Sequence, residues 1–153
     1  MEVSSHALEQ KRARGIEFDA AVFTNLTQDH LDYHKTMEAY FEAKAILFDS
    51  LTQQKTKKGR AIINLDDRYG HRLIERLSKT SVPVVTYGQG VQAAFRASDT
   101  RFDSNGSTFH LTARGRSYLV RLPLIGAFNI YNALAALAAS FSCGIELRAA
   151  VTA

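Results

Sequence analysis

The sequence predicts an α/β fold: a mostly parallel open sheet with flanking helices and a small antiparallel β section. Two short apolar runs, at residues 20–23 and 61–64, each end in polar residues, as buried parallel strands do before a loop. Segments with helical spacing follow both runs, and this alternation is typical of a parallel sheet. Between residues 91 and 123, polar and apolar residues alternate around Asn-Gly and Arg-Gly pairs, which predicts antiparallel hairpins.

The first half of the chain alternates strand-like and helical segments. Residues 1–3 have the pattern of a strand end, and the hydroxyls of Ser4 and Ser5 suit the cap of a short helix. A longer helix is predicted from residue 36 to about residue 50, because its apolar side chains recur on one stripe: Met37, Tyr40, Phe41, Leu47 and Phe48. The loops after the strands are expected at the sheet edge where open α/β folds bind ligands.

The second half adds two further helices. The apolar face of the first, which follows residues 61–64, carries Leu73, Ile74 and Leu77. A strand is predicted at residues 82–87, and an apolar helix at about residues 129–142 should end at Gly144. Cys143 falls in this apolar stretch and is expected to be a buried thiol.

Length and composition limit the classes of protein. With 153 residues, of which 46% are hydrophobic, the chain can bury one core and forms one domain or most of one. The formal net charge is +4. The densest basic run is flanked by Gln and Gly, which favours a solvated loop over a nucleic-acid site; it comprises Lys55, Lys57, Lys58 and Arg60. We therefore expect no nucleic-acid partner.

Cysteine content and hydropathy indicate a compartment. The single cysteine excludes an internal disulfide and fits a reducing cytoplasm. No apolar run approaches the roughly 20 residues that span a bilayer, and the first residues lack an export signal. We expect a cytoplasmic protein without a membrane partner, and Met1 is expected to be an internal methionine of a longer protein.

Lys44 is the most informative residue for chemistry. Helical spacing places its ammonium in the centre of the apolar stripe of residues 36–50. Burial of a lysine disfavours its charged form, and a neutral amine can react with carbon dioxide to give a carbamate, which is an oxygen ligand on a long arm. The alternative is a lysine whose stem packs among apolar side chains while its ammonium reaches solvent.

Polar residues gather in the loop before that helix: Asp29, His30, Asp32 and His34. His30 could share a Mg²⁺ ion with Glu2, because Mg²⁺ takes few protein ligands and leaves room for phosphate oxygens. Asp32 or His34 could instead cap the helix.

Two other polar pairs lie at element ends. Asp66 and Asp67 follow a predicted strand and suit either a helix cap or contact with a polar ligand. Asn129 suits the N-cap of the last helix, and Asn132 lies off the apolar stripe, facing solvent or a ligand. For each pair, the sequence pattern fits both a structural role and contact with a ligand.

Three segments together resemble the Mur ligases, and most closely the MurE branch: MEVSSHAL at residues 1–8, FTNLTQDHLDYH at residues 23–34 and GAFNIYNALAAL at residues 126–137. They occur in family order, so the resemblance covers nearly the whole chain. It implies that residues 1–153 are most of the central, ATP-binding domain of such a ligase, truncated at both ends. The family's Gly-rich phosphate loop and carboxyl-terminal domain are absent from this sequence, so the chain alone is expected to be inactive.

The resemblance implies an ATP-dependent amide ligase of peptidoglycan synthesis, and hence of cell-wall growth and division. ATP would phosphorylate the terminal carboxylate of UDP-N-acetylmuramoyl-L-alanyl-D-glutamate. The amine of meso-diaminopimelate or L-lysine would then attack the acyl phosphate. Mg²⁺ is implied as the cofactor, because phosphoryl transfer depends on neutralising developing negative charge.

The resemblance also implies roles for single residues. Lys44 matches a carbamylated lysine that supports a metal site, with Glu2 and His30 as metal ligands. The positions that match contacts to the UDP-muramoyl substrate are Ser4, Gln10 and Arg12. Asn132 matches an asparagine that contacts the adenine of ATP.

Three alternative functions also fit the sequence. A folylpolyglutamate synthase would share the ATP and carbamate chemistry, although SSHAL followed by Gln10 and Arg12 favours the muramoyl branch. A non-catalytic nucleotide-binding module would keep the fold without the chemistry. A metal-dependent hydrolase built on His30, Asp32 and His34 is less favoured, because no second cluster supplies the remaining ligands.

Overall fold

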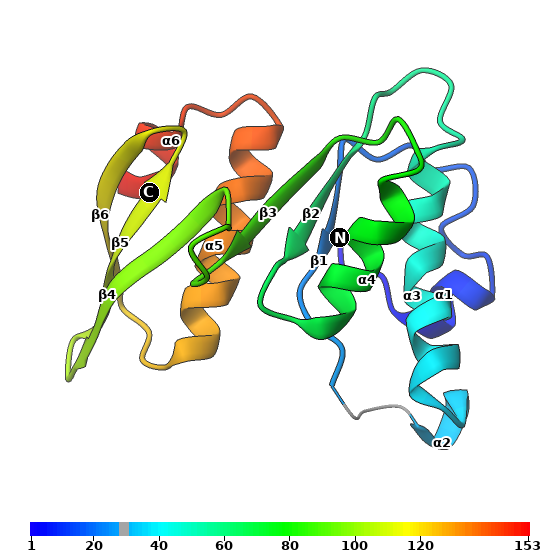
Figure 1. The fold of residues 1–153 in the computed structure, drawn as a ribbon, viewed down its shortest axis with the longest axis horizontal. Helices are drawn as coiled ribbons and strands as arrows, with labels where there is room; N and C mark the ends of the chain where they lie inside the picture. The colour runs from blue at the N-terminus through cyan, green and yellow to red at the C-terminus, as the bar shows by residue number, and fades with distance from the viewer. Residues whose placement is uncertain (28–30) are drawn as a thin grey trace.

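In the computed structural model, which describes residues 1–27 and 31–153, six strands form one sheet in the order β1 to β6 (Figure 1). The strands are β1 (Ala20–Phe23), β2 (Arg60–Asn64), β3 (Val84–Gly88), β4 (Phe95–Asp103), β5 (Gly106–Ala113) and β6 (Arg116–Leu122). β1 to β4 pair in parallel, and β4 to β6 pair antiparallel. The predicted fold class is confirmed.

The helices of the described residues flank this sheet. They are α1 (Ser5–Glu9), α2 (Leu31–His34), α3 (Met37–Leu51), α4 (Arg68–Leu77), α5 (Ala127–Ser142) and α6 (Leu147–Thr152). Figure 1 shows α3 and α4 side by side near the parallel strands, with α1 beyond them and α5 on the other side of the sheet. None of these helices has both the length and the apolar content needed to cross a membrane.

Two apolar clusters hold the layers together, one on each face of the sheet. Successive side chains of a strand point to opposite faces. Ile63 of β2 accordingly packs in the cluster that includes Phe48 of α3 and Leu73 of α4. Its neighbour Ile62 packs in the cluster that includes Leu134 of α5. All five side chains are at most 2% exposed.

Three expectations need correction. Residues 1–3 do not form a strand. Within the described chain, β1 is the first strand of the sheet, and it pairs only with β2. The strand predicted at residues 82–87 begins at Val84, after Pro83, because proline has no N–H for the ladder. Cys143 is exposed rather than buried, because it lies at the C-cap of α5, beyond the last buried turn.

The end of α5 follows the prediction. Gly144 has φ +90°, a left-handed conformation that glycine adopts without a Cβ penalty. Its N–H donates to Phe141 O at 3.0 Å, and the N–H of Ile145 donates to Ser140 O at 3.0 Å. These two bonds satisfy carbonyl groups that the helix end would otherwise leave unpaired.

Candidate functional site

The carboxyl ends of β1 and β2 are joined by a polar network. The buried Asn64 donates through Nδ2 to Thr24 O at 2.8 Å, which links the two strand ends. Asp67 accepts from Leu26 N through Oδ2 at 3.2 Å and from Tyr69 N through Oδ1 at 2.8 Å. Asp67 is therefore the N-cap of α4, one of the two roles that the sequence left open.

Asp66 takes a different role from its neighbour. Its carboxylate accepts from Gln89 N at 2.6 Å, Gly90 N at 3.2 Å and the Tyr131 hydroxyl at 2.9 Å. A Cβ on Gly88 would lie 2.7 Å from Asp66 Oδ2, so a side chain at that position would displace this carboxylate. Asp66 thus ties the loop after β2 to the loop after β3 and to α5.

The start of α5 differs from the expectation. The N-cap position is Gly126, with φ +120° and no side-chain cap, so the prediction of Asn129 as N-cap is wrong. Asn129 instead donates through Nδ2 to Ile125 O at 3.1 Å, because it already lies within the first helical turn. Asn132 is exposed, one residue after Tyr131, so its carboxamide is accessible to a ligand.

The predicted substrate-contacting residues lie around α1. Ser4 is the N-cap of this helix, and its Oγ accepts from Ala7 N at 3.2 Å. Gln10 is the C-cap, and Arg12 follows in the next turn, where its N–H donates to Ala7 O at 2.8 Å. The side chains of Ser4, Gln10 and Arg12 are exposed, as substrate contacts would be.

Lys44 lies on the apolar side of α3, as predicted. It is half-buried, between the buried Ala43 and Ala45. Its Nζ lies 5.3 Å from the centroid of the Tyr40 ring, a distance suited to a cation–π contact. The side chain therefore lies beside Tyr40 and stays partly open to solvent.

His34 does not cap α3. The N-cap is Thr36, whose Oγ1 accepts from Ala39 N at 3.1 Å. His34 is 5% exposed, and its Nε2 lies 2.8 Å from Ser5 Oγ. Sequence patterns gave no signal for this pair, because its members are 29 residues apart and belong to different elements.

The metal site stays a prediction. Glu2 is exposed, and His30, like Asp29, lies outside the described residues. Within residues 1–27 and 31–153, no three His, Cys, Asp or Glu side chains gather in a way that could hold a metal ion. The predicted ligand set of Glu2, His30 and Lys44 therefore depends on a residue that the structure does not describe.

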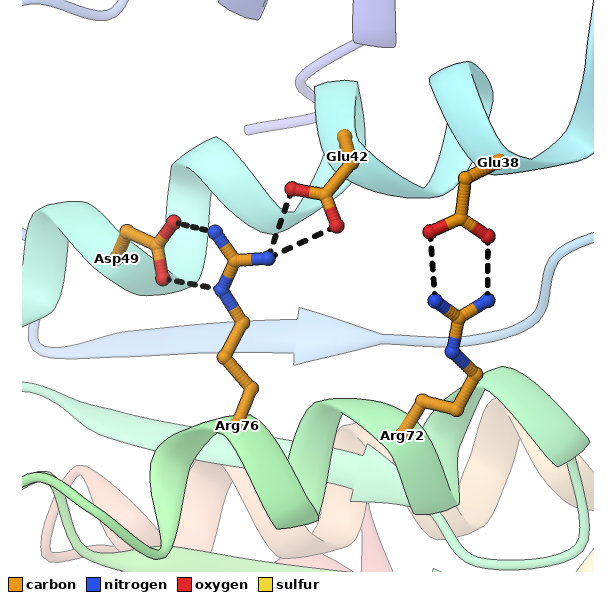
Figure 2. Close-up of polar contacts among 5 residues, drawn as sticks. All are labelled: Glu38, Glu42, Asp49, Arg72 and Arg76. Atoms are coloured by element: carbon orange, nitrogen blue, oxygen red, sulfur yellow. Dashed lines mark hydrogen bonds and ion pairs between the residues drawn. The ribbon is translucent and has the colours of Figure 1, made fainter.

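Ion pairs fix α4 against α3 (Figure 2). Arg72 makes two hydrogen bonds to the carboxylate of Glu38, at 2.6 and 2.7 Å. Arg76 lies between Glu42 and Asp49, with N–O distances of 2.8 Å and 2.6 Å to the nearer oxygen of each. These bonds hold α4 against α3, the helix that carries Lys44.

A cavity of about 500 Å³ lies between the loop after α1 and the end of α3. Its lining includes Lys11, Arg14, Ile16, Glu17 and Ile46. Ser4, Gln10, Arg12 and Lys44 do not line it. We place the candidate site at the polar strand ends and around α1 and Lys44, because those positions carry the carboxylate, amide, hydroxyl and cationic side chains described above.

An open sheet with polar residues at its strand ends, and a half-buried lysine on the helix that follows β1, is the arrangement expected of the Mur ligase central domain. A family model for the Mur ligase middle domain matches residues 1–140. The chain belongs to this family.

Two individual relatives show which members of the family this chain resembles. The chain is 49% identical over 150 residues to a UDP-N-acetylmuramoyl-L-alanyl-D-glutamate–2,6-diaminopimelate ligase of Geobacter sulfurreducens, a match that covers 96% of this chain and 29% of that protein. It is 46% identical over 153 residues to a ligase of the same name from Thermosynechococcus vestitus, covering 100% and 30%. The chain therefore spans less than a third of the length of the curated relatives it matches.

Solved structures agree with this assignment. A ligase structure of the same name has a TM-score of 0.88 at 39% identity and covers 99% of this chain and 30% of that chain. MurF from Acinetobacter baumannii has a TM-score of 0.76 at 24% identity, covering 88% and 28%. An FPGS–AMPPCP complex has a TM-score of 0.68 at 13% identity, covering 90% and 34%. The last two similarities show the fold alone.

Proposed function

We propose that this chain is the central, ATP-binding part of a ligase that joins 2,6-diaminopimelate to UDP-N-acetylmuramoyl-L-alanyl-D-glutamate in peptidoglycan synthesis. The main support is the 49% identity to a ligase of that name over 96% of this chain. The recurrence of the same name in a second relative, at 46% identity, supports diaminopimelate over L-lysine. We also propose that the protein acts in the cytoplasm, where ATP and UDP-linked precursors are available.

The surface around α1 would bind the UDP-muramoyl substrate. Ser4 Oγ accepts one hydrogen bond from Ala7 N and can still donate its proton to a carboxylate or phosphate oxygen. Gln10 supplies an exposed amide, and Arg12 an exposed permanent cation. A guanidinium beside a nucleotide-linked sugar forms charge-assisted hydrogen bonds, which are stronger than neutral ones.

Lys44, as a carbamate, would present oxygen atoms in place of an ammonium. A carbamate and the Glu2 carboxylate match the preference of Mg²⁺ for oxygen ligands, and His30 would complete the set. When bound, Mg²⁺ would supply positive charge against the phosphate oxygens during phosphoryl transfer. The position of Lys44, half-buried on α3 beside Tyr40, supports this role, because a packed side chain holds a ligand group in a fixed place.

Asn132 would contact the adenine of ATP. Its carboxamide has both donor and acceptor atoms, as the edge of a purine does. It is exposed on α5, and the adjacent Tyr131 is bonded to Asp66 at the carboxyl edge of the sheet. Ligands of open α/β sheets bind at this edge.

A ligation assay tests the proposal. The full-length protein that contains this chain is incubated with ATP, Mg²⁺ and UDP-N-acetylmuramoyl-L-alanyl-D-glutamate, and each amino acid is supplied in turn. We expect ADP release and a product of the mass of the diaminopimelate adduct, with much slower reaction of L-lysine. A parallel reaction supplies a folate and glutamate; glutamylation of the folate instead would indicate the folylpolyglutamate branch, and no ATP-dependent product in either reaction would indicate a non-catalytic module. The 153-residue chain alone is expected to form no product.

A further inference from the structure

His34 is a buried side chain between two parts of the candidate site. Its Nε2 lies 2.8 Å from Ser5 Oγ, and Ser5 is the first residue of α1, directly after Ser4. Its Nδ1 lies 3.7 Å from Oε1 of Glu9, the last residue of α1. The two ring nitrogens therefore face opposite ends of this short helix.

The flat face of the imidazole meets α3. The rings of His34 and Tyr40 are stacked, with centroids 4.9 Å apart and an interplanar angle of 13°. Tyr40 is 6% exposed and lies one helical turn before Lys44, whose Nζ is 5.3 Å from the centroid of the same ring. Tyr40 thus contacts both His34 and Lys44.

We propose that His34 is a positioning residue that aligns the amino end of α1 with Lys44 on α3. The helix α1 has five residues, too few to hold its own orientation through helical hydrogen bonds. Because α1 also contacts α3, loss of the His34 contacts would let Ser4 shift relative to Lys44. This inference rests on the proposed function, in which Ser4 binds the UDP-muramoyl substrate and Lys44 acts at the place where that substrate reacts.

The test compares variants of the full-length ligase. His34→Phe keeps a ring that can stack on Tyr40 but removes both nitrogens, and Ser5→Ala removes the hydroxyl from the other side. His34→Gln restores a side-chain nitrogen that can bond Ser5. His110→Phe makes the matched substitution at an exposed position of β5. Steady-state kinetics give a KM for each substrate, and hydrogen exchange reports the order of α1.

We expect His34→Phe to raise the KM for the UDP-muramoyl dipeptide about tenfold, because small displacements of binding groups have large effects. The KM for ATP should change much less, since its proposed adenine contact, Asn132, lies on α5, on the other side of the sheet. Ser5→Ala should act in the same direction, and His34→Gln should recover part of the loss. A loss of folded protein alone would lower kcat and leave both KM values unchanged.

The amides of α1 should exchange faster in His34→Phe than in His110→Phe. Equal exchange of α1 in these two variants, together with an unchanged KM for the UDP-muramoyl dipeptide, would overturn the inference. A wild-type protein that forms no ligation product would instead overturn the proposed function. The exchange comparison still shows in that case whether His34 orders α1, so the two failures are distinguishable.

Discussion

The Tyr131 hydroxyl donates to the carboxylate of Asp66 at 2.9 Å, and this contact fastens the first half of α5 to the loop after β2. The same carboxylate accepts from the backbone of Gln89 and Gly90, so one side chain joins three segments of the chain. Asn132, the proposed adenine contact, is the next residue after Tyr131. The contacts of Asp66 therefore affect both the stability of the protein and the proposed ATP binding.

Tyr131→Phe should lower the free energy of unfolding by about 1 kcal/mol, the typical net contribution of one hydrogen bond. Burial, and then the bond to Asp66, raise the pKa of Tyr131 above 10.0. A raised pKa means that the stabilisation is complete below pH 10 and is lost as the pH rises further. Urea unfolding from pH 7 to 11 should show a steeper alkaline loss in the wild type than in Tyr131→Phe. Tyr118→Phe serves as the control, and parallel curves for the wild type and Tyr131→Phe would contradict the prediction.

Glu17 organises the basic loop before β2. Its carboxylate accepts from the Thr56 hydroxyl and from the N–H groups of Lys55 at 2.9 Å, Thr56 at 3.0 Å and Lys57 at 2.9 Å. The Thr56 hydroxyl first, and then the N–H of Lys55, lower the pKa of Glu17 from 4.5 to about 2. The resulting stabilisation is complete above pH 4.5 and is lost as the pH falls toward 2.

Glu17→Gln should therefore lower Tm at pH 7, and its difference from the wild type should shrink below pH 4.5 and vanish near pH 2. Thermal unfolding followed by circular dichroism at several pH values measures this difference. Glu75→Gln, an exposed position on α4, is the matched control and should show no such pH dependence. A Tm difference for Glu17→Gln that is the same at pH 2 and pH 7 would contradict a stabilising role for the Glu17 carboxylate.

Arg76 should contribute more to stability than Arg72, because it bridges two carboxylates of α3 and Arg72 binds only one in the described contacts (Figure 2). Arg76→Lys keeps the charge but loses the planar fork, and we expect a cost of about 1 kcal/mol. Arg72→Lys should cost about half as much. Urea unfolding at low salt and in 1 M NaCl measures both, and salt should reduce both costs. A larger effect at Arg72 would refute this ranking.

Gly70 allows α4 to approach β2 closely. A Cβ at this position would lie 2.0 Å from Asn64 O, a backbone atom that cannot move aside cheaply. Alanine is normally favoured over glycine in a helix by about 1 kcal/mol. Gly70→Ala should nevertheless destabilise the protein by about 1–3 kcal/mol, the usual cost of overpacking. An increase in stability in urea unfolding would show that α4 does not need glycine at this position to pack closely on β2.

Local patterns in the sequence predicted most of the fold. The apolar runs at residues 20–23 and 61–64 became β1 and β2, because burial on both faces leaves a continuous apolar signal. The helical stripe after Thr36 and the glycine after Cys143 marked the ends of α3 and α5 within one or two residues. These features depend on neighbours in sequence, so they can be read without the structure.

The candidate site was only partly predictable. Asp67 could be foreseen as a helix cap, because its partners follow it directly in the chain. The contacts of His34 and Asp66 could not, since Ser5 and Tyr131 lie 29 and 65 residues away from them. Thr36 caps α3 in place of His34 because it directly precedes the helix with an extended backbone, and the side chain of Asp32 lies outside what the structure describes. Long-range pairs of this kind are set by the fold, and local residue preferences do not encode them.

The central claim, that Lys44 acts as a carbamate in a Mur-type ligation, is tested most directly by Lys44→Ala in the full-length ligase. ADP release and adduct formation are measured with and without added acetate or formate, whose carboxylates can take the place of the carbamate. We predict loss of ligation on substitution and partial recovery with the added carboxylate. Full activity of Lys44→Ala without any addition would contradict the claim.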